Sequence, residues 1–225
     1  MNAGLQPTSA LSQNLELARV LSELLEVATG DDRVIANARA TVAERGEEPT
    51  LGEISELCSE AALPVRPEVG RLLYMLVRIL RPDIVVEFGT SFGASLLYLA
   101  AGVHENGSGK VYGTEMSGKK LARARHNLDR VGLAEHAVII EGDARETLSS
   151  IPGPVKLVLL DGWKELYLPV LKVLEPKMTP GTVVVADNLS MLPPEYLDHV
   201  RTPAHHYVSI SLPLGDGIEL SLRIG

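Results

Sequence analysis

Cysteine, long apolar runs and clusters of basic residues are all scarce in this sequence. Cys58 is the only cysteine among 225 residues, so no disulfide can form within the chain, as is typical of a protein kept in a reducing compartment. No apolar run approaches the roughly 18 residues of a membrane-spanning helix. The start of the chain lacks the basic and apolar segments of a signal peptide. We therefore expect a cytoplasmic protein with no membrane partner.

The charge pattern argues against nucleic-acid binding. The chain has 21 lysines and arginines against 29 acidic residues, a formal net charge of −8. No cluster of lysine or arginine is longer than a pair, whereas a surface that follows phosphates concentrates such residues. Hydrophobic residues make up 45% and charged residues 22% of the chain, which is a globular balance. The length suits one domain, so we expect residues 1–225 to form a single domain.

The first part of the chain, residues 1–80, is predicted to be a helical cover on that domain. A helix over 11–29 carries one apolar stripe, made of Leu11, Leu15, Ala18, Leu21 and Leu25. A second helix is predicted at 32–45, and a third begins at Thr50, where Glu53 is placed for a capping box. The segment "PEVGRLLYMLVRIL" is a fourth helix that ends before Pro82.

From residue 81 onward the pattern changes to alternating strands and helices, which we interpret as the core of the domain. The apolar runs are continuous rather than alternating, so the strands should be buried on both faces of a mostly parallel sheet. The last 20 residues or so alternate instead and contain a Gly-Asp-Gly turn, which predicts an antiparallel hairpin. The predicted parallel strands are 84–88, 110–115, 137–140, 155–160 and 182–187.

Acidic residues stand at or near the carboxyl ends of all five strands. Ligands of open α/β sheets bind at this edge. A single acid there often caps a helix or forms a turn, but five on one edge indicate a site. The five are Glu87, Glu115, Asp143, Asp161 and Asp187.

The first group of these acids predicts a nucleoside site. Gly89 and Gly93 let the backbone approach a ligand, and the helix that follows directs free N–H groups toward it. Glu115, at the end of the second strand, is placed to accept from ribose hydroxyls. The segment "GTSFG" lacks the glycine spacing of dinucleotide sites. A nucleoside that carries positive charge, S-adenosylmethionine (SAM), fits an acidic loop of this kind.

The second group predicts a cation site with a base beside it. Asp161, Asp187 and Asn188 offer three oxygen ligands from neighbouring strand ends, which suits Mg²⁺ or another hard divalent cation. Lys164 lies three residues after Asp161, on the first turn of a predicted helix. A nearby cation disfavours its ammonium form, so Lys164 is a candidate general base.

These motifs resemble the metal-dependent class I O-methyltransferases, and among them the catechol O-methyltransferases. The resemblance extends over roughly residues 33–225. It is most specific in "DGWKELYLP" followed by "VVVADN". Other matching segments are "LPVRPEVG", "EFGTSFGAS", "TEM", "EGDA", "PPEYLDHVR" and "GDGIE".

The resemblance implies a Rossmann-like, seven-stranded mixed sheet with helices on both faces, and it assigns roles to single residues. Asp161, Asp187 and Asn188 would bind the metal ion. Lys164 would take the proton of the reacting hydroxyl, and Glu219 in "GDGIE" would hydrogen-bond the second catechol hydroxyl. The implied SAM site comprises Val65, Glu87, Gly89, Ser91, Ser95, Glu115, Met116, Asp143, Ala144, Asp161 and Trp163.

The implied activity is Mg²⁺-dependent transfer of a methyl group from SAM to a hydroxyl of a catechol-type small molecule by SN2 displacement. The sequence departs from the animal catechol enzymes at Ala61, where they have tryptophan, and at Gly162, where they have histidine. The loop after Asn188 is also shorter. A bulkier natural-product phenol or a sugar diol therefore stays open as acceptor, as does a SAM-binding module without catalysis. The chain can be a monomer or a homodimer.

Overall fold

A single seven-stranded sheet organises the chain, in the order β3-β2-β1-β4-β5-β7-β6. The structure is a computed structural model that describes residues 14–46 and 48–225. β1 pairs in parallel with β2 and β4, and β7 pairs antiparallel with β5 and β6. This confirms the predicted mixed sheet with its C-terminal hairpin. The strands are β1 (Ile84–Phe88), β2 (Lys110–Glu115), β3 (Ala137–Glu141), β4 (Val155–Leu160), β5 (Met178–Asp187), β6 (Tyr207–Leu212) and β7 (Ile218–Arg223).

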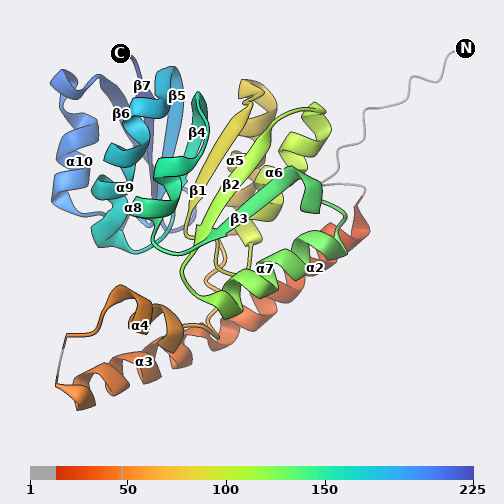
Figure 1. The fold of residues 1–225 in the computed structure, drawn as a ribbon, viewed down its shortest axis with the longest axis vertical. Helices are drawn as coiled ribbons and strands as arrows, with labels where there is room; N and C mark the ends of the chain where they lie inside the picture. The colour runs from red at the N-terminus through yellow and green to blue at the C-terminus, as the bar shows by residue number, and fades with distance from the viewer. Residues whose placement is uncertain (1–13, 47) are drawn as a thin grey trace, which may run out of the picture.

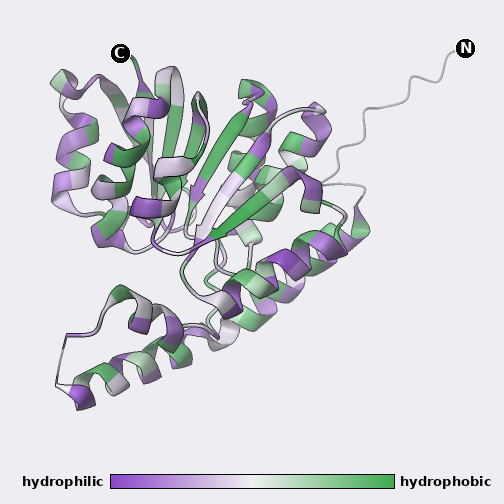
Figure 2. Ribbon diagram, viewed as in Figure 1, coloured by the Kyte–Doolittle hydropathy of each residue, from purple (hydrophilic) through white to green (hydrophobic). Residues whose placement is uncertain are grey.

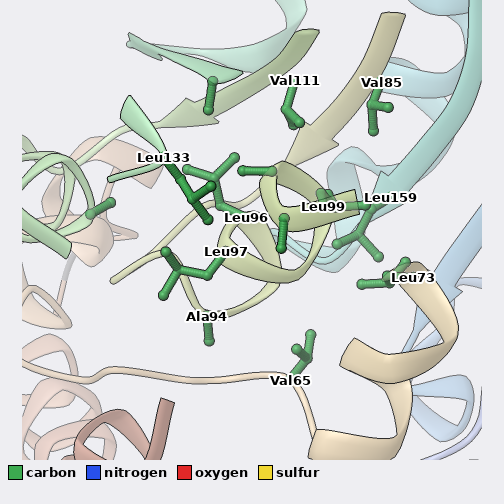
Figure 3. Packing of buried hydrophobic residues seen from close by; sticks show 14 of the residues in the cluster. Val65, Leu73, Val85, Ala94, Leu96, Leu97, Leu99, Val111, Leu133 and Leu159 are labelled. Carbon is green, nitrogen blue, oxygen red and sulfur yellow. The ribbon is translucent and has the colours of Figure 1, made fainter. Parts of the chain in front are cut away.

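Both faces of the central strands are buried, as continuous apolar runs require. In β1, Val85 belongs to one hydrophobic cluster, whereas Val86 and Phe88 belong to the other. Figure 2 shows the central strands as strongly hydrophobic. Figure 3 shows the first cluster, in which Leu96 and Leu99 lie against the sheet residues Val85 and Val111.

Helices cover the two faces of the sheet (Figure 1). α2 (Leu15–Val27), α5 (Pro67–Leu80), α6 (Ala94–Asn106) and α7 (Gly118–Arg130) contribute to the first cluster. α8 (Ala144–Thr147), α9 (Tyr167–Leu174) and α10 (Pro194–Arg201) contribute to the second. Among the described residues, no helix has the length and apolar character needed to cross a membrane.

Two further helices, α3 (Asp31–Arg45) and α4 (Leu51–Leu57), stand away from the sheet in Figure 1. α3 ends at Gly46, and α4 begins with the predicted capping box. In that box Thr50 Oγ1 accepts from the N–H of Glu53 at 3.3 Å, and Glu53 Oε2 accepts from the N–H of Thr50 at 2.8 Å. The local sequence therefore specifies both helix ends, independently of the rest of the fold.

The predicted apolar stripe of the first helix is wrong at Leu15 and Leu25, although its member Leu21 packs against the first hydrophobic cluster. Leu15 is 83% exposed and Leu25 is 38% exposed, whereas Leu17, Val20 and Leu24 are buried. α2 carries apolar residues on more than one side, so its sequence contains two regular stripes. The stripe made of Leu17, Val20 and Leu24 is the one that packs against the rest of the protein. The predicted start of this helix at Leu11 lies outside the described residues.

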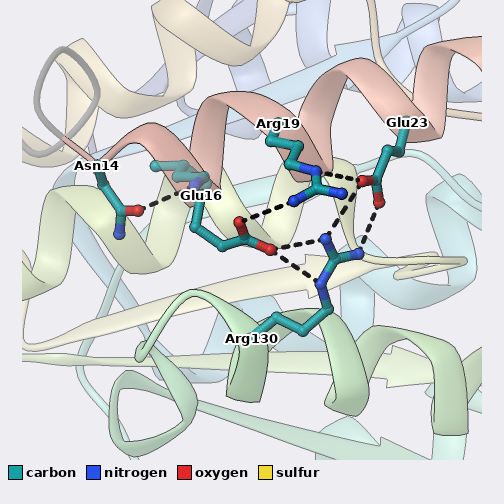
Figure 4. Close-up of polar contacts among 6 residues, drawn as sticks. Asn14, Glu16, Arg19, Glu23 and Arg130 are labelled. Atoms are coloured by element: carbon teal, nitrogen blue, oxygen red, sulfur yellow. Dashed lines mark hydrogen bonds and ion pairs between the residues drawn. The ribbon is translucent and has the colours of Figure 1, made fainter.

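One arginine of α7 joins α2 to the body of the protein (Figure 4). Arg130 donates to Glu16 at 2.7 and 3.1 Å and to Glu23 at 2.6 and 3.3 Å. The Arg130 guanidinium holds the pKa of Glu23 below its usual value. Arg19, within α2, also donates to Glu23, but its side chain is 70% exposed against 24% for Arg130. The bridge between the two helices therefore depends on Arg130.

We expect Arg130→Met to lower the melting temperature, because it removes the only ion pairs that join α2 to α7 among the described residues. Arg19→Met is the matched control, since it changes the same residue type within α2 and should have a small effect. Differential scanning calorimetry at low and high salt measures both variants. High salt should narrow the difference between Arg130→Met and wild type. An equal melting temperature for wild type and Arg130→Met at low salt contradicts the expectation.

Candidate active site

The two central strands of the sheet define the site. β1 and β4 are neighbours, and the chain leaves them in opposite directions, with β2 beyond β1 and β5 beyond β4. Ligands of such sheets bind at this point of reversal, beyond the carboxyl ends of the strands. The loops that follow β1 and β4 therefore form the floor of the candidate site.

These two loops touch through glycine. Gly89 has a φ of +95°, and a Cβ built on it would lie 2.5 Å from the carbonyl oxygen of Asp161. A Cβ on Gly162 would lie 2.4 Å from the ring of Phe88. A side chain at position 89 would displace backbone, and one at position 162 would displace the buried ring of Phe88. The glycine expected at the SAM loop is thus required for the loop to lie against the β4 loop.

Glu87 is a fully buried carboxyl group under the β1 loop. Thr90 Oγ1 donates to its Oε2 at 2.7 Å, while Oε1 lacks a hydrogen-bond partner among the described residues. A Cβ on Gly113 would lie 2.4 Å from Thr90 Oγ1, so the glycine in β2 makes room for this pair. Burial raises the pKa of Glu87 to about 7, although Ser95 and Thr90 act in the opposite direction. A buried carboxyl with one oxygen that lacks a hydrogen bond suits a ligand that carries positive charge.

Glu115 joins the β1 loop to the beginning of α7. Its Oε2 accepts from the N–H of Ser91 at 2.8 Å, and its Oε1 accepts from the N–H groups of Met116 and Ser117 at 2.8 and 2.9 Å. A carboxylate has about four acceptor positions, so Oε2 retains one for a ribose hydroxyl. Ser91 has a φ of +48°, an unusual value for serine, and its hydrogen bonds to Glu115 and Ala62 hold it in this conformation.

The segment between α4 and α5 is fixed from two sides. Asp31 of α3 accepts from the N–H groups of Ala62 and Leu63 at 2.8 and 2.7 Å. Ser91 Oγ donates to the carbonyl oxygen of Ala62 at 2.8 Å. These bonds set Val65 against α6, where it lines a small hollow with Ala94 and Tyr98. Sequence reasoning missed Asp31, because an acid in the first turn of a helix is common for helix-dipole reasons alone.

The residues expected around adenine follow the ends of β2, β3 and β4. Met116 is half-buried after β2, Ala144 is buried at the start of α8, and Trp163 packs against the second hydrophobic cluster. Asp143 caps α8, accepting from the N–H of Arg145 at 2.8 Å, and it forms an ion pair with the Arg145 side chain at 2.5 Å. Asp143 is therefore already engaged in the structure as a helix cap.

The ends of β4 and β5 bring Lys164 to the predicted metal ligands. Lys164 Nζ lies 2.7 Å from Asn188 Oδ1 and 3.6 Å from Asp161 Oδ1. Asn188 adopts the left-handed region, with φ 62° and ψ 61°, which asparagine tolerates well. Burial and the neighbouring Asp187 raise the pKa of Asp161 well above its usual value, whereas burial lowers the pKa of Lys164.

The same residues can hold a divalent cation. Asp187 is buried, and its Oδ1 lacks a hydrogen-bond partner among the described residues. Two close carboxylates and one carboxamide oxygen are the donor set that a hard cation prefers. No group of three or more His, Cys, Asp or Glu side chains suited to a metal occurs in the described part of the chain. The candidate site has two such acids and takes its third oxygen from Asn188.

Glu219, which is expected to contact the acceptor, is held by two side chains of the fold in this structure. In β7 it is opposite Ala186, so it faces α10 and not the side to which the next residue, Asp187, points. Its side chain is fully buried and accepts from Arg201 at 2.8 Å and from Ser211 at 2.6 Å. Ala61, at the tryptophan position of the animal enzymes, is also fully buried. Both residues are therefore engaged within the fold.

The rim of the site combines the hairpin turn with the segment before α5. The N–H of Leu189 donates to the carbonyl oxygen of Gly217 at 2.8 Å, which fixes the turn beside Asn188. Arg66 forms an ion pair with Asp216 at 3.1 Å, and both side chains are more than half exposed. The hairpin turn therefore lies next to Asn188 at the edge of the candidate site.

Several known proteins resemble this chain in sequence. A methyltransferase domain family model matches residues 86–189. A catechol O-methyltransferase of Mycobacterium tuberculosis is 31% identical over 64% of the chain and 66% of that protein, and one of Niastella koreensis is 29% identical over 64% and 67%. The matched segment thus spans about two thirds of the length of these bacterial relatives. The mouse catechol O-methyltransferase is 26% identical over 90% of the chain and 82% of its own length.

Solved structures share the fold. Cofactor-bound Rv0187 from MTB superposes with a TM-score of 0.61 and 26% identity over 86% of the chain and 91% of its own. An O-methyltransferase from Bacillus cereus in complex with SAH has a TM-score of 0.63 and 19% identity, over 91% and 97% of the two chains. At 19% identity, the similarity to the Bacillus cereus structure supports the fold and not a shared function.

Binding of SAM should release protons near pH 7, because the free Glu87 carboxyl has a pKa of about 7. A cationic ligand favours its ionised form and lowers that pKa, so up to about half a proton leaves per SAM bound. Calorimetric titrations in two buffers of different ionisation enthalpy measure this release. Glu87→Gln should abolish it, whereas Glu141→Gln, at an exposed neighbouring position, should retain it. Release that persists in Glu87→Gln would contradict the assignment.

Proposed function

Because the chain belongs to the SAM-dependent O-methyltransferases related to the catechol O-methyltransferases, we propose that it methylates one hydroxyl of a catechol-type small molecule with the help of Mg²⁺. The observation that carries the proposal is the meeting of Lys164 with Asp161 and Asn188, beside the loop that SAM is expected to occupy. We further propose that the whole described chain serves as one methyltransferase domain.

The β1 loop supplies the proposed cofactor site. Val65 and Ser95 would contact the methionine part of SAM, and Glu87 beneath the loop would lie near its positive charge. Glu115 would accept from the ribose. Met116, Asp143, Ala144 and Trp163 would surround the adenine, after the neighbouring strands. Gly89 and Ser91 would present loop backbone to the ligand.

Asp161, Asp187 and Asn188 would hold the cation, and Asp161 also borders the β1 loop. When bound there, a divalent cation supplies Lewis acidity, which favours ionisation of an acceptor hydroxyl. Burial lowers the pKa of Lys164, so its neutral amine is accessible for proton uptake. Lys164 Nζ takes the acceptor proton as the oxygen attacks the methyl carbon, the carbon–sulfur bond breaks, and S-adenosylhomocysteine leaves.

The acceptor need not be a simple catechol. Glu219 is engaged with Arg201 and Ser211, so these contacts give no support to a hydrogen bond from it to a second hydroxyl. This observation favours the alternative that a bulkier phenol or a sugar diol is the natural acceptor. The retained base and oxygen ligands argue against a module that only binds SAM.

Methyl transfer from labelled SAM to 3,4-dihydroxybenzoate should occur with Mg²⁺ and stop when EDTA removes it. Scintillation counting of the extracted product measures the transfer, and restored Mg²⁺ should restore it. Transfer that persists in EDTA would contradict the role of the cation. No transfer to this compound, with transfer to larger phenols, would support the alternative acceptor.

Lys164→Ala should lower turnover by roughly 10²-fold to 10⁴-fold, the usual contribution of a general base. SAM affinity should stay close to that of wild type, because Lys164 is assigned to the acceptor proton and not to a contact with SAM. Lys172→Ala, an exposed lysine of α9, is the matched control and should retain activity. Calorimetry gives the SAM affinity, and an equal loss of affinity and turnover would contradict the base assignment.

A further inference from the structure

Tyr167 occupies a rigid position directly beneath Lys164. It is the first residue of α9, and its side chain is fully buried. Its ring packs edge-on against Phe88, with 6.1 Å between centroids, and against Tyr196, with 5.7 Å. Core packing on both sides therefore fixes the location of the Tyr167 hydroxyl.

The hydroxyl of Tyr167 makes hydrogen bonds in two directions. Lys164 Nζ donates to its oxygen at 2.6 Å, and the hydroxyl donates to the backbone carbonyl of Asp187 at 3.3 Å. Because a carbonyl can only accept, the proton of Tyr167 is directed toward Asp187. The phenolic oxygen is then an acceptor for the lysine.

The amine of Lys164 has few other partners. Asn188 Oδ1 lies at 2.7 Å and Asp161 Oδ1 at 3.6 Å, and both belong to side chains assigned above to the cation. A neutral amine has two N–H groups and one lone pair. If its N–H groups donate to Tyr167 and Asn188, the two short contacts, the lone pair is left for the third direction, toward the site.

We propose that Tyr167 is a positioning residue for the reaction, holding Lys164 Nζ so that its lone pair meets the acceptor hydroxyl. The inference rests on the proposed function, in which Lys164 is the base. Among the three described partners of Nζ, only Tyr167 has no assigned role as a cation ligand. It therefore holds the amine in the same place whether or not the cation is bound.

Tyr196 provides the internal control for this inference. It is as fully buried as Tyr167 and lies edge-on to it, yet its hydroxyl has no hydrogen-bond partner among the described residues. Removing either hydroxyl leaves the aromatic packing in place. Only the removal of the Tyr167 hydroxyl takes a hydrogen bond from Lys164.

The first test compares Tyr167→Phe with Tyr196→Phe in the methyl-transfer assay. Tyr167→Phe should lower kcat about tenfold or more, with KM for the acceptor and the calorimetric Kd for SAM and for Mg²⁺ unchanged. Tyr196→Phe should keep the wild-type kcat. Tyr167→3-fluorotyrosine keeps a weaker acceptor oxygen at the same position, so its kcat should fall between those of Tyr167→Phe and wild type, and it also serves if Tyr167→Phe fails to fold.

The second test asks whether Tyr167 acts through Lys164. In the Lys164→Ala background, adding Tyr167→Phe should cause no further loss of kcat, because the group that it positions is gone. An additional tenfold loss in that background, a parallel loss of SAM affinity, or a wild-type kcat for Tyr167→Phe would each overturn the inference. If Lys164→Ala itself stays active, the base assignment of the proposed function fails instead.

Discussion

The close approach of the loops after β1 and β4 is the constraint on which the site depends. At Gly89 a side chain would collide with the backbone of Asp161, and at Gly162 with the ring of Phe88. This contact fixes the position of Asp161 beside the cofactor loop. It thereby also fixes the start of the segment that carries Lys164, three residues later. Glu115 and Asp31 then hold the surrounding loops in place through backbone N–H groups. The close packing at Gly89 and Gly162 therefore determines where the polar residues at the ends of β1 and β4 lie relative to each other.

The parts that were predicted from sequence are those that local rules or strand edges determine. The buried strands follow from continuous apolar runs, and the capping box at Thr50 needs only four residues. The meeting of Lys164 with Asp161 and Asn188 could also be predicted, because β4 and β5 are parallel neighbours that end on one edge. A resemblance of the motifs to a known family added the single-residue roles.

The parts that were missed depend on distant partners. The direction of Glu219 follows from the register between β7 and β5, which no local pattern reveals, and its partner Arg201 comes from α10. Asp31 binds backbone groups some 30 residues away. Which apolar stripe of α2 is buried depends on the helices it meets. In each case an isolated segment offers two acceptable arrangements, and tertiary packing selects one.

The anchoring of the segment at Ala62 has a consequence for the helices that stand away from the sheet. The carboxylate at the start of α3 and the hydroxyl of Ser91 in the cofactor loop hold opposite sides of the same peptide segment. A change in the tilt of α3 therefore moves a contact of the cofactor loop. The first turn of α3, far from the sheet in the sequence, thus serves as a brace for the cofactor loop, because the two are joined through a single peptide segment.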